Sequence, residues 1–167
     1  VALSENGVPK GLKLNAHRRC FSAEEHRTGT TSDASGDPAL GWGIIGDGVM
    51  HAGRWASLAR MPGSTAAAEL CPIVAYVVYF GRRLRHSLFT GVTDSEAAFY
   101  ALCTGSSSEP EVFEMLAILA EAQRIWDIRV LGEWLPRELN HETDCLSKFK
   151  HPGQHLALPL PILHLSA

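Results

Sequence analysis

The spacing of apolar residues changes along the chain, and each change predicts a different kind of element. Trp42 and Ile44 alternate with small residues, and the turn sequence Gly46-Asp47-Gly48 follows them, which is typical of a hairpin. Residues 49–55 then return as the partner strand. Residues 27–32 favour an extended backbone, although they hold almost no apolar bulk, and they predict an earlier strand. The folded part of the chain therefore begins with three strands.

After this meander the apolar spacing becomes helical. Residues three and four apart predict an amphipathic helix over 69–85, through Leu70, Ile73, Val74, Val77 and Val78. Pro72 lies near the start of this helix, so we expect the helix either to begin close to Glu69 or to kink there. The later elements are a buried strand over 86–92, a short helix over 94–103, a longer helix over 109–126 with Pro110 in its first turn, a strand over 128–134 and a final helix capped by Asn140.

Strands that alternate with helices after a meander predict an α/β protein, with a mixed sheet of five strands and helices packed on its faces. A chain of 167 residues is long enough to form one good hydrophobic core. Residues 1–27 and 151–167 show no periodicity and contain several helix-breaking residues. We interpret them as a linker and an irregular tail on either side of one domain, over residues 28–150.

Composition and charge narrow the possible functions. The net charge of −3 argues against a strong general attraction to nucleic acid, so any such binding would depend on local groups. The longest apolar run, residues 71–80, is too short to span a bilayer, and we expect no membrane association. The cysteines are isolated, without the spacing of a zinc site, and indicate reduced thiols in an intracellular protein of the cytoplasm or nucleus: Cys20, Cys71, Cys103 and Cys145.

Four acidic residues stand at the edges of predicted elements, next to apolar sequence: Asp33, Glu69, Asp94 and Asp144. In mixed sheets, sites form at the carboxyl ends of strands and at helix N-termini, where all four are expected. If the fold gathers these carboxylates, their repulsion favours a bound cation, and oxygen ligands favour Mg²⁺ or Mn²⁺. Taken singly, each also has a structural explanation, because Asp33 suits a turn while Glu69 and Asp144 suit a helix N-terminus.

The motifs around these four residues occur in a recognisable order. Asp-Ala-Ser-Gly is followed by Gly-Trp-Gly, Ala-Glu-Leu, Thr-Asp-Ser and the long block Trp-Leu-Pro-Arg-Glu-Leu-Asn-His-Glu-Thr-Asp-Cys-Leu-Ser-Lys. Successive carboxylates are 36, 25 and 50 residues apart. Over residues 28–150 this order resembles the ribonuclease H domain of retrotransposon reverse transcriptases, in the group that includes the DIRS-like elements. The long final block is the most specific part of the resemblance.

The resemblance implies an RNase H-like fold, in which three antiparallel strands are followed by parallel additions. It also implies hydrolysis of the RNA strand of RNA/DNA hybrids with two Mg²⁺ or Mn²⁺ ions. Asp33, Glu69, Asp94 and Asp144 would be the catalytic metal ligands, and Asp33 would bridge both ions. The implied partners are the hybrid and an upstream reverse transcriptase domain, which residues 1–27 would connect to this domain.

Four further residues flank the proposed site and are expected to contact the hybrid. They are the backbone amides of Ser35 and Gly36 and the side chains of Arg137 and Asn140, which can bond phosphate or 2′-hydroxyl groups. The sequence departs from its relatives at Ser95, where Asn is common, and it lacks the basic handle helix that some of them carry. Two alternatives therefore stay open: a catalytically inert RNase H-like module for structure or binding, and another nuclease or strand-transfer enzyme on the same fold.

Overall fold

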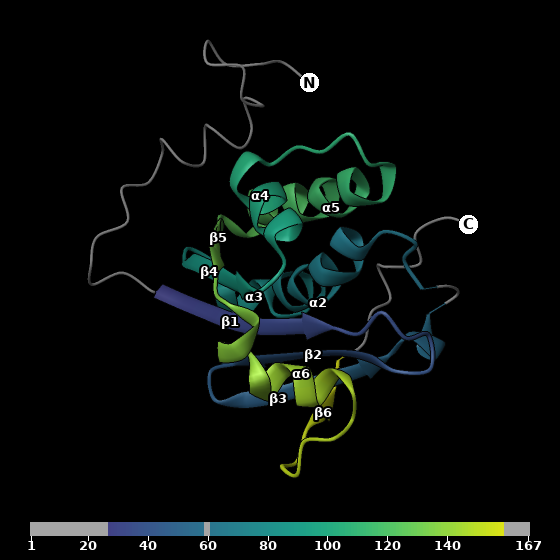
Figure 1. The fold of residues 1–167 in the computed structure, drawn as a ribbon. Coiled ribbons are helices and arrows are strands. Elements are labelled where there is room, and N and C mark those ends of the chain that lie inside the picture. Colours follow the sequence, from purple (N-terminus) through teal and green to yellow (C-terminus); the bar gives the residue numbers. More distant parts are fainter. Residues whose placement is uncertain (1–26, 59–60, 159–167) are drawn as a thin grey trace.

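The centre of the protein is a mixed sheet of six strands (Figure 1). The structure is a computed structural model that describes residues 27–58 and 61–158. The strands are β1 (Arg27–Ala34), β2 (Gly41–Gly46), β3 (Val49–Arg54), β4 (Leu88–Thr93), β5 (Arg129–Trp134) and β6 (Leu156–Ala157). Their order in the sheet is β5-β4-β1-β2-β3-β6. The pairs β1–β2 and β2–β3 are antiparallel, whereas β1–β4, β4–β5 and β3–β6 are parallel.

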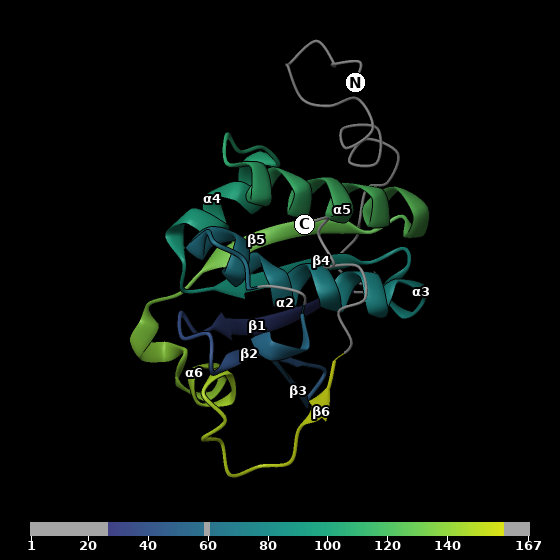
Figure 2. The same cartoon turned by 90° about the vertical axis from the view of Figure 1, so that its right-hand side faces the viewer.

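Helices cover both faces of this sheet. They are α2 (Thr65–Tyr79), α3 (Gly81–Leu84), α4 (Glu96–Thr104), α5 (Pro110–Trp126) and α6 (His141–Ser147), with 3-10 turns η1 (Trp55–Ser57) and η2 (Arg137–Leu139). On one face, α2 packs against β1 and β2, and α4 and α5 lie next to α2 (Figure 2). On the opposite face, α6 packs on β1, β2 and β3. The predicted α/β class, the mixed sheet and the helices on both faces are confirmed.

The prediction of five strands was wrong by one, because β6 adds a sixth. Its two residues pair with His51 and Ala52 of β3, and the following Leu158 is only 4% exposed. A strand of two residues has no alternation that a sequence pattern could reveal, so this part of the expected irregular tail was missed. The predicted linker, up to residue 26, and the end of the tail, from residue 159, lie outside the described residues.

The central strand β1 is built from small polar residues. Thr30 and Ser32 are 3% and 0% exposed, and both lie deep in the sheet. At Gly46, which pairs with Thr30, a Cβ atom would lie 2.5 Å from the Tyr76 hydroxyl oxygen of α2 and 2.9 Å from Thr30 Cγ2. Small residues on the strands therefore let α2 approach the sheet closely, which explains a central strand without apolar bulk.

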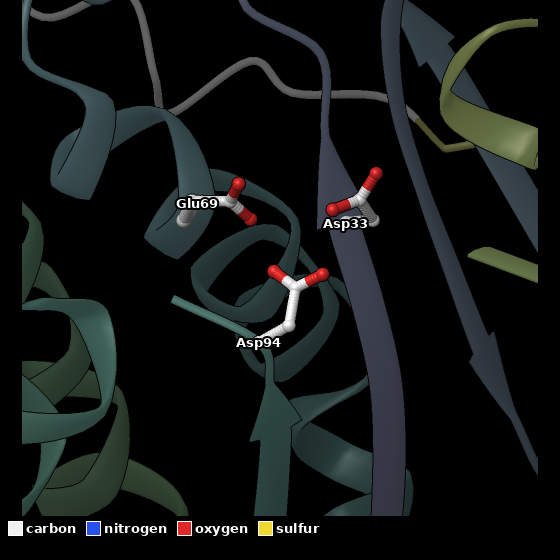
Figure 3. A group of neighbouring side chains, drawn as sticks. All are labelled: Asp33, Glu69 and Asp94. Carbon is white, nitrogen blue, oxygen red and sulfur yellow. The ribbon is translucent and has the colours of Figure 1, made fainter. Parts of the chain in front are cut away.

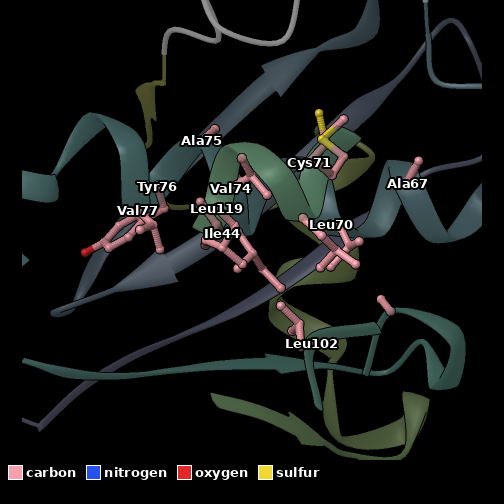
Figure 4. Close-up of a cluster of buried hydrophobic side chains, with 14 of the residues drawn as sticks. Ile44, Ala67, Leu70, Cys71, Val74, Ala75, Tyr76, Val77, Leu102 and Leu119 are labelled. Atoms are coloured by element: carbon pink, nitrogen blue, oxygen red, sulfur yellow. The ribbon is translucent and has the colours of Figure 1, made fainter. Parts of the chain in front are cut away.

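The helix α2 differs from its prediction in its bounds and in its burial. It begins at Thr65, and the Ser64 side chain caps it by accepting a hydrogen bond from Ala67 N–H at 3.3 Å. Every residue from Ala66 to Val77 is buried, so the helix is not amphipathic but lies between the sheet and α5 (Figure 4). Pro72 is inside the helix, and Glu69 therefore lies in its second turn rather than at its start.

None of the helices in the described part of the chain is long and apolar enough to cross a bilayer. Among the described cysteines, Cys71, Cys103 and Cys145 are free thiols. Cys71 is buried in α2, and burial raises the pKa of its thiol, so it behaves as an apolar core residue. Cys20 lies outside the described residues.

Candidate metal centre

Three of the four predicted carboxylates meet at one edge of the sheet. Asp33 lies near the carboxyl end of β1, Asp94 directly follows β4, and Glu69 projects from α2 (Figure 3). One oxygen atom from each of the three lies within 4.8 Å of the others. The parallel pairing of β1 with β4 brings two of these acids to the same edge, and the N-terminal half of α2 supplies the third.

Hydrogen bonds hold the backbone around Asp94 in place. The Ser95 N–H donates to Thr93 Oγ1 at 3.1 Å, and Ser95 Oγ in turn caps α4 by accepting from Ala98 N–H at 3.2 Å. The indole N–H of Trp134, at the end of β5, donates to the Asp94 carbonyl oxygen at 3.1 Å. Ser95, which differs from the Asn common in the family that the sequence resembles, thus acts as a helix cap.

Asp33 is 6% exposed, and its charged form is costly in this position. Burial first, and then the negative charges of Asp94 and Asp144, raise the pKa of Asp33 to about 7. Two groups act in the opposite direction: the Ser147 hydroxyl of α6, which donates to Asp33 Oδ2 at 3.0 Å, and the positive charge of Arg137. A group with this pKa is partly protonated at neutral pH unless a cation neutralises the site.

Glu69 is more strongly perturbed. Burial first, and then the negative charges of Asp33 and Asp94, raise the pKa of Glu69 to about 9, although a hydrogen bond from the Ala34 backbone and the charge of Arg137 oppose the shift. Its side chain is 7% exposed, and its Oε2 atom has no hydrogen-bond partner within residues 27–58 and 61–158. Buried polar atoms are normally satisfied, so an oxygen in this state is suited to bind a cation.

The three carboxylates fit a hard divalent cation. All of the available donor atoms are oxygens, which Mg²⁺ and Mn²⁺ prefer over softer metals. A cation would neutralise the repulsion between the charges and would satisfy the unpartnered Glu69 oxygen. The three carboxylates are therefore suited to the Mg²⁺ or Mn²⁺ ion that the sequence led us to expect.

The fourth predicted carboxylate, Asp144 on α6, is not part of this group in the described structure. Its two oxygens lie 3.1 Å and 3.3 Å from the ammonium nitrogen of Lys148, one helical turn away. Asp144 is nevertheless near enough for its charge to raise the pKa of Asp33. It therefore lies beside the cluster, paired with a lysine.

The four residues that were expected to contact substrate fall into two pairs. The Ser35 N–H donates to the Gly41 carbonyl oxygen at 2.8 Å, and the Ser35 carbonyl oxygen accepts from the Trp55 indole N–H at 2.9 Å. Both backbone groups of Ser35 are thus engaged inside the protein. Gly36 and Arg137 are exposed, and the charge of Arg137 acts on both Asp33 and Glu69. Of these two pairs, Gly36 and Arg137 have the accessibility that substrate contact needs.

Asn140 belongs with Ser35, because its amide group is used inside the protein. It is 3% exposed, its Nδ2 donates to the Ser32 carbonyl at 2.9 Å, and its Oδ1 accepts from the Thr143 hydroxyl. Asn140 is the N-cap residue of α6, as predicted, but its side chain makes no cap hydrogen bond. Asn140 instead ties the start of α6 to β1, one residue before Asp33.

Sequence reasoning did not single out Ser147, Lys148 or Trp134 as site residues. Ser147 and Lys148 lie three and four residues after Asp144, the spacing that places side chains on one helix face. That spacing could have identified both of them. No comparable signal was available for Trp134, because its contact with the Asp94 carbonyl depends on the pairing of β4 with β5.

No family model matches the sequence, and no curated protein matches it either. Among solved structures, RNase H1 from the halophilic archaeon Halobacterium salinarum is similar, with 17% identity, a TM-score of 0.53, and coverage of 75% of this chain and 97% of that chain. The N-terminal RNase H domain of a Mycobacterium tuberculosis protein has 14% identity, a TM-score of 0.54, and coverage of 74% and 92%. LC11-RNase H1 in complex with RNA/DNA hybrid has 18% identity, a TM-score of 0.52, and coverage of 72% and 91%.

The protein has the RNase H-like fold. At these identities the likeness concerns the fold, and the residues of the site must carry the case for function. In this RNase H-like fold, the three clustered carboxylates occupy the ends of β1 and β4 and the second turn of α2. The fourth acid lies on α6, across the sheet from α2, and its lysine is the C-cap residue of that helix.

Proposed function

We propose that the protein is a metal-dependent endonuclease that hydrolyses the RNA strand of RNA/DNA hybrids. The observation that carries this proposal is the cluster of Asp33, Glu69 and Asp94. One oxygen from each lies within 4.8 Å of the others, and the buried Glu69 Oε2 has no hydrogen-bond partner among the residues that the structure describes. The fold supports the same reading, because a protein of similar fold, LC11-RNase H1, was solved in complex with such a hybrid.

In this proposal Asp33, Glu69 and Asp94 would hold one Mg²⁺ or Mn²⁺ ion, and Asp33 and Asp144 would hold a second. When bound, such a pair of ions lowers the pKa of the attacking water and stabilises the leaving 3′ oxygen of an in-line displacement. The residues of the chain position these ions and exclude bulk water from Glu69. Arg137 supplies positive charge beside the cluster, where it can attract a phosphate of the hybrid.

We further propose that the domain is part of a retroelement reverse transcriptase of the DIRS-like group. Support comes from the order of the motifs, and above all from the block over residues 134–148. Residues 1–27 would then connect it to an upstream polymerase domain, and the working compartment would be the cytoplasm or nucleus. The polymerase would help to hold the hybrid, since the net charge of −3 gives this domain little general attraction for it.

The decisive experiment is cleavage of a hybrid labelled on its RNA strand, with Mg²⁺ or Mn²⁺, by the wild type and by Asp33→Asn. Asp37→Asn is the matched control, because Asp37 is exposed and lies in the loop four residues later. We expect RNA cutting that requires metal, that disappears in Asp33→Asn and that persists in Asp37→Asn. Cutting that survives Asp33→Asn would show that the site is elsewhere.

One observation favours a second candidate, an inert RNase H-like module. The carboxylate of Asp144 is paired with Lys148, so the fourth acid is engaged by the protein itself. A well-folded wild type that binds hybrid but neither binds metal nor cuts RNA would support this candidate over the nuclease.

A further inference from the structure

We propose that Lys148 controls the entry of a second divalent cation by acting as a built-in competing cation at Asp144. The inference rests on the proposed function and deepens it, because it concerns how the fourth carboxylate joins the metal centre. Lys148 would thereby be a positioning residue, which acts through Asp144 and touches neither ion nor substrate.

The first step is the geometry of the pair. The Lys148 ammonium nitrogen lies 3.1 Å from one oxygen of Asp144 and 3.3 Å from the other, so it engages both oxygens that a metal would use. Among residues 27–58 and 61–158, no lysine or arginine forms an ion pair with Asp33, Glu69 or Asp94, and Glu69 Oε2 has no hydrogen-bond partner there. Of the four acids, Asp144 alone is paired with a cationic side chain in the part of the chain that the structure describes.

The second step is that α6 itself is fixed. Asn140 ties its start to the Ser32 carbonyl, and Leu146 packs against Gly43 of β2, where no side chain would fit. Near its end, Ser147 Oγ lies 3.0 Å from Asp33 Oδ2 and 2.8 Å from the Asp144 carbonyl. These contacts hold the backbone of Asp144 beside Asp33 whatever the side chain of Asp144 binds.

The third step is that the ion pair can exchange its cation. The side chains of Asp144 and Lys148 are 34% and 41% exposed, so both can change rotamer without moving the helix. A partly exposed lysine–carboxylate pair is weak, and a divalent ion can displace the ammonium group when its concentration is high enough. The metal position formed by Asp33, Glu69 and Asp94 would thus fill first, and the position at Asp144 would fill second and more weakly.

The test is calorimetric titration of the whole chain with Mn²⁺ for the wild type, Lys148→Gln, Lys148→Arg and Asp144→Asn. Lys150→Gln is the matched control, since Lys150 is an exposed lysine two residues away. We expect one tight and one weak binding event in the wild type. Lys148→Gln should tighten the weak event by roughly threefold to tenfold and leave the tight event unchanged. Lys148→Arg should resemble the wild type, and Asp144→Asn should lose the weak event.

A second readout is the Mn²⁺ concentration at half-maximal hybrid cleavage, which Lys148→Gln should lower and Lys150→Gln should not. Thermal unfolding of each variant confirms that it is folded. The inference is overturned if Lys148→Gln leaves the weak event unchanged, or if Lys150→Gln tightens it equally, which would indicate a simple effect of net charge. In either case, normal tight Mn²⁺ binding and normal RNA cleavage would still support the proposed nuclease function. Absence of any Mn²⁺ binding by the wild type would overturn both the nuclease function and the role of Lys148.

Discussion

Glu69 has a side chain whose charge the metal-free protein stabilises poorly. It is buried, it faces two other acids, and one of its oxygens lacks a hydrogen-bond partner within the described ranges 27–58 and 61–158. Its pKa of about 9 and that of Asp33, about 7, mean that the folded protein holds protons that the unfolded chain would release near pH 4. The site is therefore stable either with protons or with a cation.

This proton uptake predicts the pH dependence of stability. Without metal, the free energy of unfolding should fall as the pH rises from about 4 to about 9, because the folded state binds more protons across that window. Mg²⁺ should reverse part of this loss, and its stabilising effect should be larger at pH 9 than at pH 6. Urea denaturation at each pH, with EDTA or with Mg²⁺, measures both effects. A metal-free stability that rises over this range would contradict the prediction.

Replacing Glu69 by Gln removes the charge while keeping the shape. At pH 9 without metal, Glu69→Gln should raise the free energy of unfolding by about 1–3 kcal/mol, because the buried charge is gone. The same variant should lose tight Mn²⁺ binding and RNA cleavage. Denaturation and calorimetry measure the two effects, and Glu114→Gln, at an exposed position on α5, serves as the control. A less stable Glu69→Gln protein would mean that Glu69 Oε2 has a hydrogen-bond partner.

At the scale of single elements, the bounds of a helix or strand were predicted best where its apolar residues recur regularly and its ends carry a turn or capping residue. The hairpin of β2 and β3 and the helix α5 were predicted almost to the residue, because a glycine turn and Pro110 mark their ends. The helix α2 was placed several residues late, since its first turns are alanines and carry no periodic signal. Its burial on all sides also required knowledge of the neighbouring α5.

The buried hydroxyl groups of the strand β1 lead to a prediction about stability. The hydroxyl oxygens of Thr30 and Ser32 are buried and have no hydrogen-bond partner in the described part of the chain. Thr30→Val keeps the shape and removes this unsatisfied group, so it should stabilise the protein by about 1 kcal/mol. Thr31→Val, at a half-buried position, is the comparison and should change stability less. Chemical denaturation measures both, and a destabilised Thr30→Val would reveal a hydrogen bond to water.

At the scale of the whole molecule, the sheet gathers acids that are far apart in the sequence. The order of strands and helices predicted that Asp33 and Asp94 would share one edge, and the structure places them there. The internal role of Asn140 could not be predicted, because it depends on how α6 lies across β1. Side-chain partners across elements have no local signature.

The sixth strand leads to a prediction about the stability of the whole domain. Leu158 is 4% exposed and belongs to the main hydrophobic core, whereas Leu156 in β6 is 60% exposed. Leu158→Ala should lower the free energy of unfolding by about 2–4 kcal/mol, and Leu156→Ala should change it by less than about 0.5 kcal/mol. Urea denaturation compares them. Equal effects would show that the chain after residue 150 contributes little to the core.

The direction of β1 has a consequence for anything joined to the domain. The strand enters the sheet at Arg27 and reaches Asp33 six residues later, which at about 3.3 Å per residue is a distance of about 20 Å. A polymerase attached ahead of Arg27 would therefore be anchored at the end of the sheet opposite the carboxylates. The point of attachment and the carboxylates would thus lie about 20 Å apart, at the two ends of the same strand.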